Sequence, residues 1–163
     1  SGFSDLATQT NVSGSASGRL TVFYKTATGS EGATVAGTTS GNTITAHNSY
    51  RISGWFGTPE AAVTSGTSTT PNPATLTPSW GYAKTLWLAA STSDRAFATH
   101  TLSAYPSGYS GGIQASASVA VVNTSVLTGS AWLTSEAASQ DPGTFTISDS
   151  LPWSVATVGI QPI

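Results

Sequence analysis

The chain has 163 residues, enough for one domain with its own core, and only 7% of them are charged. Five basic and seven acidic residues give a formal net charge of −2, so we expect no nucleic acid partner bound through phosphates. The absence of cysteine excludes disulfides, a thiolate nucleophile and zinc–thiolate chemistry. With two histidines and no clustered ligand motif, we expect no metal site and no cofactor. No apolar run approaches the ~20 residues of a transmembrane helix, so we expect no membrane insertion.

Hydrophobic residues recur with a period of two rather than with helical spacing, which predicts short β-strands. In Arg19–Thr26, for example, Leu20, Val22 and Tyr24 share one side of a pleated strand. The predicted strands, in chain order, are Arg19–Thr26, Thr43–Ser53, Lys84–Ser91, Ile113–Asn123, Thr144–Ser148 and Trp153–Ile160, with weaker candidates at Ala33–Gly37, Ala96–Leu102 and Ser130–Leu133.

Turn residues separate these segments at intervals of about 8–12 residues, which is typical of a sandwich or barrel. The predicted fold is therefore all-β: a single antiparallel β-sandwich over residues 1–163, jelly-roll-like, with roughly 8–10 strands. The proline-rich stretch 57–79 is predicted to be a long surface connection. An interdomain linker is the weaker alternative, because neither half is large enough for a core of its own.

The expected core combines residues from five of the predicted strands. The last strand presents Val155 and Val158 on opposite faces, so it lies between two layers if both are buried. The predicted core residues are Leu20, Val22, Leu86, Leu88, Val119, Val121, Phe145, Ile147, Val155 and Val158.

Catalytic motifs have little support. Gly108–Gly112 matches the G-x-S-x-G elbow of hydrolases, but a strand pattern follows it, and both histidines precede Ser110. A convergent triad using His47 or His100 with Asp94 has no supporting pattern. No two of the seven carboxylates are marked as a pair for glycoside hydrolysis. We therefore expect a non-enzymatic protein.

Aromatic side chains are the remaining candidates for recognition, because a weakly charged protein must bind through apolar and hydrogen-bonding contacts. One group surrounds the proline-rich stretch and another lies in the loop that precedes Ile113. The alternative is that these rings cap the ends of the core. The candidate interface residues are Trp55, Phe56, Trp80, Tyr82, Tyr105 and Tyr109.

Several segments together resemble small β-sandwich proteins of tailed-phage virions, which have related modules in secreted bacterial proteins. The similar segments are FYKTATGSEGATV (Phe23–Val35), YRISGW (Tyr50–Trp55), PNP (Pro71–Pro73), LTPSWG (Leu76–Gly81), KTLWLAAS (Lys84–Ser91), AYPSGYSGG (Ala104–Gly112), EAASQDPGTFTIS (Glu136–Ser148) and WSVATVGIQP (Trp153–Pro162). The resemblance is structural and implies no catalytic residue.

The resemblance implies a virion structural or accessory protein, such as a capsid decoration, tail or fibre component. Its expected partners are other virion proteins or copies of itself, and we expect a homo-oligomer in the virion or an extracellular setting. A carbohydrate-binding or adhesion module that recognises a host surface glycan is the alternative, and a small β-sandwich hydrolase is a weaker one.

Overall fold

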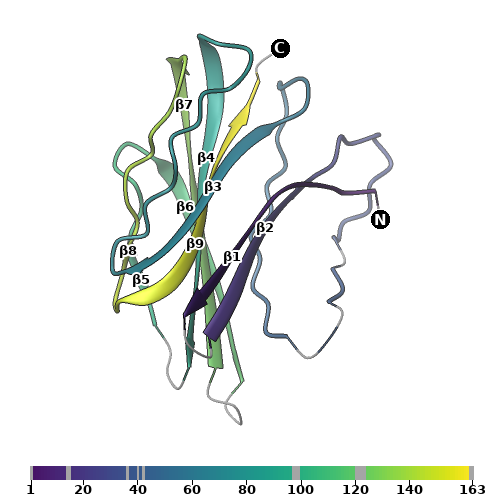
Figure 1. The fold of residues 1–163 in the computed structure, drawn as a ribbon. Helices are drawn as coiled ribbons and strands as arrows, with labels where there is room; N and C mark the ends of the chain where they lie inside the picture. Colours follow the sequence, from purple (N-terminus) through teal and green to yellow (C-terminus); the bar gives the residue numbers. More distant parts are fainter. Residues whose placement is uncertain are drawn as a thin grey trace.

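The computed structural model describes residues 2–13, 16–35, 37–39, 41, 43–96, 100–119 and 124–161. In this part of the chain there is no helix, and every strand pairing is antiparallel, so the predicted all-β antiparallel class is confirmed (Figure 1). The strands are β1 (Ser4–Ser13), β2 (Ala16–Tyr24), β3 (Glu60–Ser68), β4 (Ala83–Ala96), β5 (Leu102–Ala104), β6 (Ser110–Val119), β7 (Thr124–Ala137), β8 (Thr146–Ile147) and β9 (Leu151–Ile160).

A five-stranded sheet with the order β3-β9-β4-β7-β6 forms the centre of the molecule. The two-stranded sheet β1-β2 packs across one face, over β3, β9 and β4 (Figure 1). We call this the hairpin face. Its core is a cluster in which Leu20 of β2 meets Leu86 of β4 and Val158 of β9. Burial of these aliphatic side chains holds the two sheets together.

The opposite face, which we call the loop face, is covered mainly by irregular chain. Phe145 N–H donates to the Pro71 carbonyl and Ile147 N–H to the Thr69 carbonyl. These bonds join the connection that follows β3 to the segment that precedes β9. Thr157 Oγ1 on β9 donates to the Ala74 carbonyl at 2.6 Å. These bonds satisfy polar groups that the loops bring against the sheet.

Strand β9 is buried on both of its faces, as expected for a strand between two layers. Val155 on the loop face and Val158 on the hairpin face are both buried. Leu20, Leu86, Phe145 and Ile147 are also buried, which confirms most of the predicted core. Val22 and Leu88 are partly buried. The prediction for Val119 is wrong because it lies on the outermost strand, where 42% of its surface is exposed, and Val121 lies outside the described residues.

The predicted strand Thr43–Ser53 is wrong in one respect and right in another. Ile44, Ala46 and Asn48 are partly buried while their neighbours are exposed, so the period of two is real. However, the described part of this segment joins no β-ladder. Asn48 Nδ2 instead donates to the Ile113 carbonyl and to Ser130 Oγ, which ties the segment to the hairpin face of β6 and β7. The alternation of hydrophobic and polar residues thus indicates that one side of the extended chain is buried. It does not indicate that the backbone pairs with another strand.

The stretch 57–79 is not simply a surface connection, because it contains β3, an edge strand of the central sheet. Every residue of β3 from Glu60 to Ser68 pairs with β9. The prolines lie outside this strand, and Pro71 and Pro73 are fully buried. The connection that follows β3 therefore packs along the loop face.

Other strand predictions differ mainly in their ends. The described part of Ile113–Asn123 is strand as far as Val119, and only Thr146–Ile147 of the predicted Thr144–Ser148 is strand. Ser130–Leu133 lies inside the longer β7, whereas the described part of Ala33–Gly37 is not strand. Of Ala96–Leu102, positions 97–99 lie outside the described residues. The sandwich and jelly-roll arrangement stays a prediction.

Gly66 on β3 allows the Trp153 ring to lie flat against the strand. A Cβ at this position would stand 2.5 Å from Trp153 Cζ2, and the indole is held in place because its Nε1 donates to Ser68 Oγ. Gly66→Ala should therefore lower the free energy of unfolding by about 1–3 kcal/mol through overpacking, measured by chemical denaturation. Gly32→Ala, where a Cβ meets nothing within 4 Å, is the matched control. Equal stability of the two variants would contradict this account.

Candidate functional site

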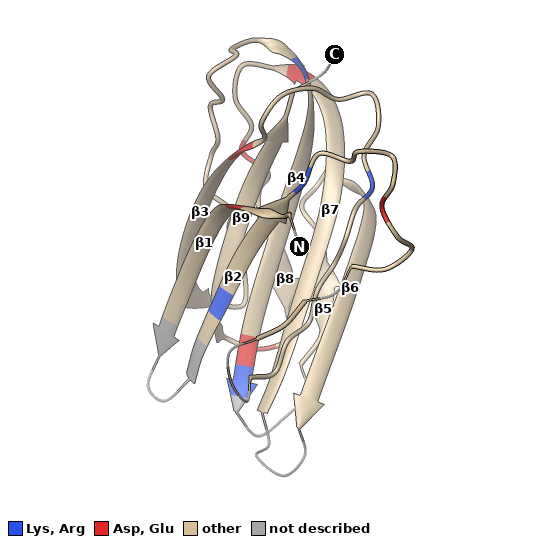
Figure 2. Cartoon of the chain, turned by 90° about the vertical axis from the view of Figure 1, so that its right-hand side faces the viewer, with Lys and Arg blue, Asp and Glu red and all other residues tan. Residues whose placement is uncertain are grey.

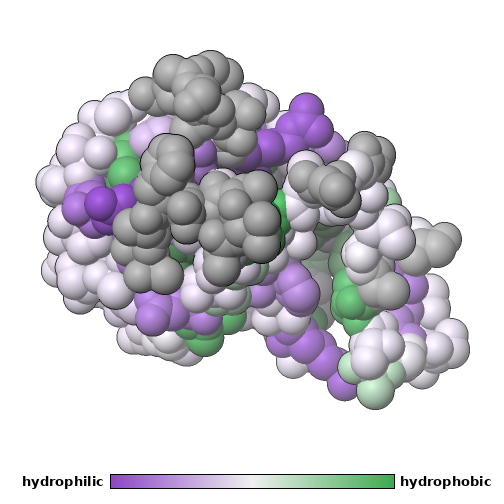
Figure 3. Space-filling view, turned by 90° about the horizontal axis from the view of Figure 1, so that it is seen from below, coloured by the Kyte–Doolittle hydropathy of each residue, from purple (hydrophilic) through white to green (hydrophobic). Residues whose placement is uncertain are grey.

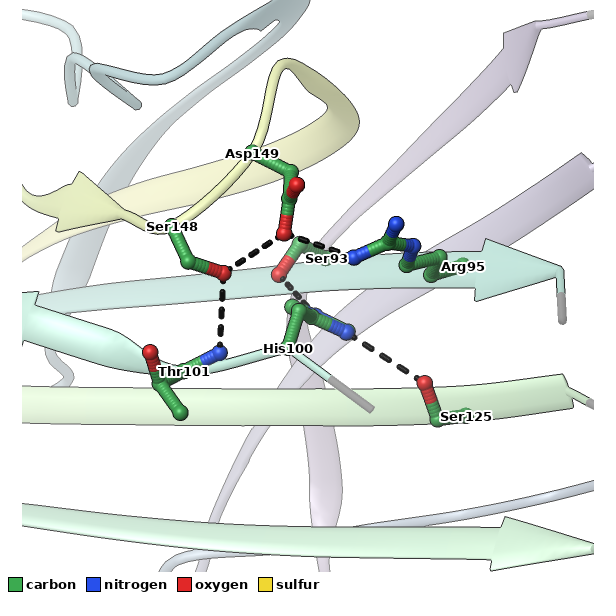
Figure 4. A network of polar contacts seen from close by, with 7 residues as sticks. All are labelled: Ser93, Arg95, His100, Thr101, Ser125, Ser148 and Asp149. Atoms are coloured by element: carbon green, nitrogen blue, oxygen red, sulfur yellow. Dashed lines mark hydrogen bonds and ion pairs between the residues drawn. The ribbon is translucent and has the colours of Figure 1, made fainter. Parts of the chain in front are cut away.

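The most organised polar cluster lies on the loop face near the end of β4 (Figure 4). His100 Nε2 lies 2.7 Å from Ser93 Oγ on β4, and His100 Nδ1 lies 3.3 Å from Ser125 Oγ on β7. All three residues are buried. One hydroxyl on each ring nitrogen is what a neutral imidazole needs, since it donates one hydrogen bond and accepts one.

Asp149 lies near this cluster but serves a different partner. Its Oδ2 accepts from Arg95 Nη1 at 2.6 Å and from Ser148 Oγ at 2.7 Å, while Ser148 Oγ accepts the N–H of Thr101 (Figure 4). A catalytic triad needs a carboxylate on the second histidine nitrogen and an accessible serine. In the described residues His100 has Ser125 in that position, and Ser93 is buried.

Burial is the main influence on the charge state of His100 and lowers its pKa below the usual 6.5. Arg95 lowers the pKa further, while a hydrogen bond with the backbone of Ser93 and the negative charge of Asp149 act in the opposite direction. The imidazole is therefore neutral at pH 7. This arrangement joins β4 to β7 and does not resemble a reaction centre.

The triad considered with Asp94 or His47 is not assembled either. Asp94 lies on the hairpin face, where Oδ1 is close to Gly18, and burial raises the pKa of this carboxyl. His47 is exposed on the segment between β2 and β3. Ser110 of the G-x-S-x-G match is exposed at the start of β6 and is followed by strand, not by helix.

Carboxylates are scattered rather than paired (Figure 2). Glu31 pairs with Lys25 at 3.3 Å, and Glu60 accepts from the backbone and side chain of Ser79. Among the described residues, no three of His, Cys, Asp or Glu lie close enough to hold a metal ion. The same part of the chain contains no helix long and apolar enough to cross a membrane.

The structure separates the first group of aromatic candidates. Trp55 packs against the core cluster on the hairpin face, whereas Trp80 lies on the loop face, where its Nε1 donates to Thr85 Oγ1 at 3.1 Å. Phe56 and Tyr82 are exposed, by 65% and 71%. The four rings therefore do not form one surface.

Tyr105 and Tyr109 are more enclosed than loop recognition residues would be. The Tyr105 ring meets Phe145 edge to face, with ring centroids 6.0 Å apart, and its edge lies over Gly112. Burial raises the pKa of both tyrosines. This geometry favours the capping alternative for the pair.

An apolar groove that the sequence did not reveal lies on the hairpin face. It has a volume of about 280 Å³. Leu86, Leu88 and Trp132 belong to the central sheet, and the chain from Tyr50 to Trp55 forms the opposite wall. Figure 3 shows a hollow between the body of the molecule and its right-hand lobe, with hydrophobic surface beside it. The groove residues are Tyr50, Arg51, Ile52, Ser53, Trp55, Leu86, Leu88, Trp132 and Thr134.

Two rings at the groove are held in place from the side of the sheet. Tyr50 OH lies 2.8 Å from Ser130 Oγ, and the Nε1 edge of Trp132 packs over Gly111. Even so, 36% of Tyr50 and 40% of Trp132 remain exposed. Anchored aromatic rings with free surface are suited to contact with another molecule. Of the predicted site residues, only Trp55 lines this groove.

No family model, no curated protein and no solved structure matches this chain.

His100 should make the stability of the protein depend on pH. The unfolded chain binds a proton below about pH 6.5, whereas the folded state resists protonation until the lower pKa of His100 is reached. The free energy of unfolding should therefore fall as the pH drops from 6.5 through that lower pKa, measured by denaturation at each pH. His100→Gln should remove this component, and His47→Gln should retain it. An unchanged pH profile in His100→Gln would refute the assignment.

The capping role of Tyr105 can be separated from a contact role. Tyr105→Ala should lower the free energy of unfolding by about 2 kcal/mol, less than the ~3–5 kcal/mol of a fully buried aromatic residue, because the ring is only partly enclosed. Tyr82→Ala, at an exposed ring, should stay within about 0.5 kcal/mol of the unchanged protein. Both values come from chemical denaturation. Similar effects at the two positions would contradict capping.

Proposed function

We propose that this chain is a non-enzymatic virion structural or accessory protein, of the capsid decoration, tail or fibre type, that acts through protein–protein contacts. The observation that carries the proposal is the groove on the hairpin face, whose anchored rings stay partly exposed in a chain with few charged residues. Apolar surface with few ionic groups is suited to stable contact with a fixed partner rather than to long-range steering. The segments that resemble tailed-phage proteins supply the virion setting.

The enclosed polar cluster supports a non-enzymatic role. Its serine and histidine side chains are buried and bonded to one another, so they position strands instead of meeting a substrate. The small cavity beside His100 has a volume of about 90 Å³, well below the ~300–1,000 Å³ of typical ligand sites.

The proposal predicts that peptides of this chain occur in purified virus particles. Tailed-phage particles from the source of the sequence would be banded on a density gradient and analysed by mass spectrometry. The expected result is co-purification with capsid or tail proteins in a constant ratio. Recovery only from the soluble fraction would overturn the proposal.

The contact itself should depend on apolar surface and hardly on salt. Chain bound to particles should stay attached from low to high ionic strength, because screening weakens only interactions between charges. Ile52→Asp places a carboxylate in the groove and should reduce attachment. The matched control Tyr82→Asp changes an exposed ring that does not line the groove. Loss of attachment by salt alone would argue against this mode of binding.

A glycan-binding module is the second candidate, and the composition of the groove favours it. Trp132 offers a ring to stack on sugar, and Arg51 with Thr134 offers hydrogen bonds. A glycan array distinguishes the two candidates: sugar binding that is lost in Trp132→Ala would favour the module, and an empty array would exclude the tested sugars.

A further inference from the structure

Strand β6 is the outer strand of the central sheet, and among the described residues it pairs only with β7. In an antiparallel pair, half of the backbone N–H and C=O groups of an edge strand point away from the neighbour. No backbone–backbone hydrogen bond on that outer side joins residues 111–119 to any other described residue. The edge is therefore a template for a further strand.

From Ile113 to Val119, β6 carries none of the features that discourage such pairing. Protected edges carry charges, prolines or bulges. Ser110–Val119 has neither a charge nor a proline, and its one irregularity lies between Ser110 and Ile113. From Ile113 to Val119 the pairing with β7 is regular. The other edge strand, β3, carries Glu60 and lies under β1.

The side chains of β6 are arranged symmetrically about Ser116. Ile113 and Val119, exposed by 38% and 42%, lie three residues to either side. Ala115 and Ala117 flank Ser116 directly and point to the same face as those two residues, since alternate residues share a face. The remaining pair, Gln114 and Ser118, is polar and lies on the other face with Ser116.

We propose that β6 pairs with β6 of a second copy of this chain, antiparallel about a twofold axis at Ser116. In this register Ile113 lies opposite Val119 and Ala115 opposite Ala117, so apolar meets apolar on the hairpin face. Gln114 lies opposite Ser118, so polar meets polar on the loop face. A twofold contact requires this self-complementarity, and the absence of charge avoids repulsion between identical strands. The two central sheets become one sheet.

The dimer deepens the proposed function, on which its biological role rests, by naming a copy of the chain as a partner. It also accounts for Ile113 and Val119, two of the larger hydrophobic residues left exposed in the described structure. Each would cover the other across the new strand pair.

Single cysteines test the register, because the natural chain has none. In Ser116→Cys the two sulfurs would face each other across the axis, within the ~4.4–6.8 Å Cα separation that a disulfide needs. In Ser118→Cys the two positions are offset by roughly 13 Å along the strands. With oxidised glutathione, Ser116→Cys should form a covalent dimer and Ser118→Cys should not, as seen on non-reducing gels. Equal cross-linking of both, or none in Ser116→Cys, would overturn the proposal.

Charge variants test the same contact without forming a covalent bond. Ser116→Lys and Ser116→Glu should each raise the concentration at which half the chain is dimeric by about fivefold or more, measured by sedimentation, because like charges lie opposite each other. An equal mixture of the two should recover the dimer. Thr67→Lys on β3, an exposed position at the other edge, should leave it unchanged. Circular dichroism would verify folding of each variant.

The outcomes separate the dimer from the proposed function. A chain that is monomeric at every soluble concentration would overturn the dimer, even if its peptides co-purify with particles. Dissociation by Thr67→Lys but not by Ser116→Lys would also overturn it. A Ser116-dependent dimer of a chain absent from particles would support the strand pairing and refute the virion role.

Discussion

The burial of β9 on both faces is the constraint on which the rest of the structure depends. A strand with two covered faces must keep small side chains where its neighbours approach closely, and Ala156 and Gly159 fill that role on opposite faces. A Cβ on Gly159 would stand 3.3 Å from side-chain atoms of Leu76, Trp80 and Trp87, so glycine gives the loop-face side chains the closest approach to the strand. On the hairpin face, Val158 and Ile160 complete the cluster with β2. Strand β9 therefore carries packing contacts to both layers, as does its neighbour β4, where Leu86 and Trp87 are buried on opposite faces.

Hydroxyl groups take the role that charged residues have in most proteins, including within the sheet itself. Thr92 Oγ1 donates to the Leu127 carbonyl, and Thr128 Oγ1 donates to the Ser91 carbonyl, which cross-links β4 and β7 beyond their backbone ladder. A short hydroxyl side chain can be buried wherever a carbonyl is within reach, whereas an ionised group needs a partner of opposite charge. Asp94 illustrates the difference, since its Oδ1 is buried with no hydrogen-bond partner in the part of the chain that the structure describes, and burial raises the pKa of the carboxyl. Within the sheet, hydroxyl groups thus satisfy buried polar positions that an ionised group would occupy at a cost.

The sequence was sufficient for the class of fold and for most of the core, because alternation records which side of an extended chain is buried. It could not tell that Thr43–Ser53 lacks a ladder, since one-sided burial looks the same with or without a strand partner. It also missed β3, in which hydrophobic and polar residues do not alternate. The groove was hidden for a different reason: Tyr50 and Trp132 come from segments far apart in the chain and meet only in the fold. A surface built by aromatic residues from distant segments cannot be recognised before the fold brings those segments together.

The two edge strands of the central sheet, β3 and β6, differ in how far other parts of the chain cover them. At β3, the neighbouring strand β1 lies across the sheet, Gln9 Nε2 donates to Ser65 Oγ, and Glu60 adds a charge at one end. At β6, the only side-chain bond to the strand backbone among the described residues is that from Asn48 to the Ile113 carbonyl. A weakly charged protein cannot rely on net repulsion to keep copies apart, so an open uncharged edge would be a constant risk of non-specific association. Symmetric pairing limits that risk, because a twofold contact pairs the β6 edge of each copy with the β6 edge of the other. The assembly is then closed at two chains. The same low charge from which we expect no nucleic acid partner thus favours a defined contact between copies.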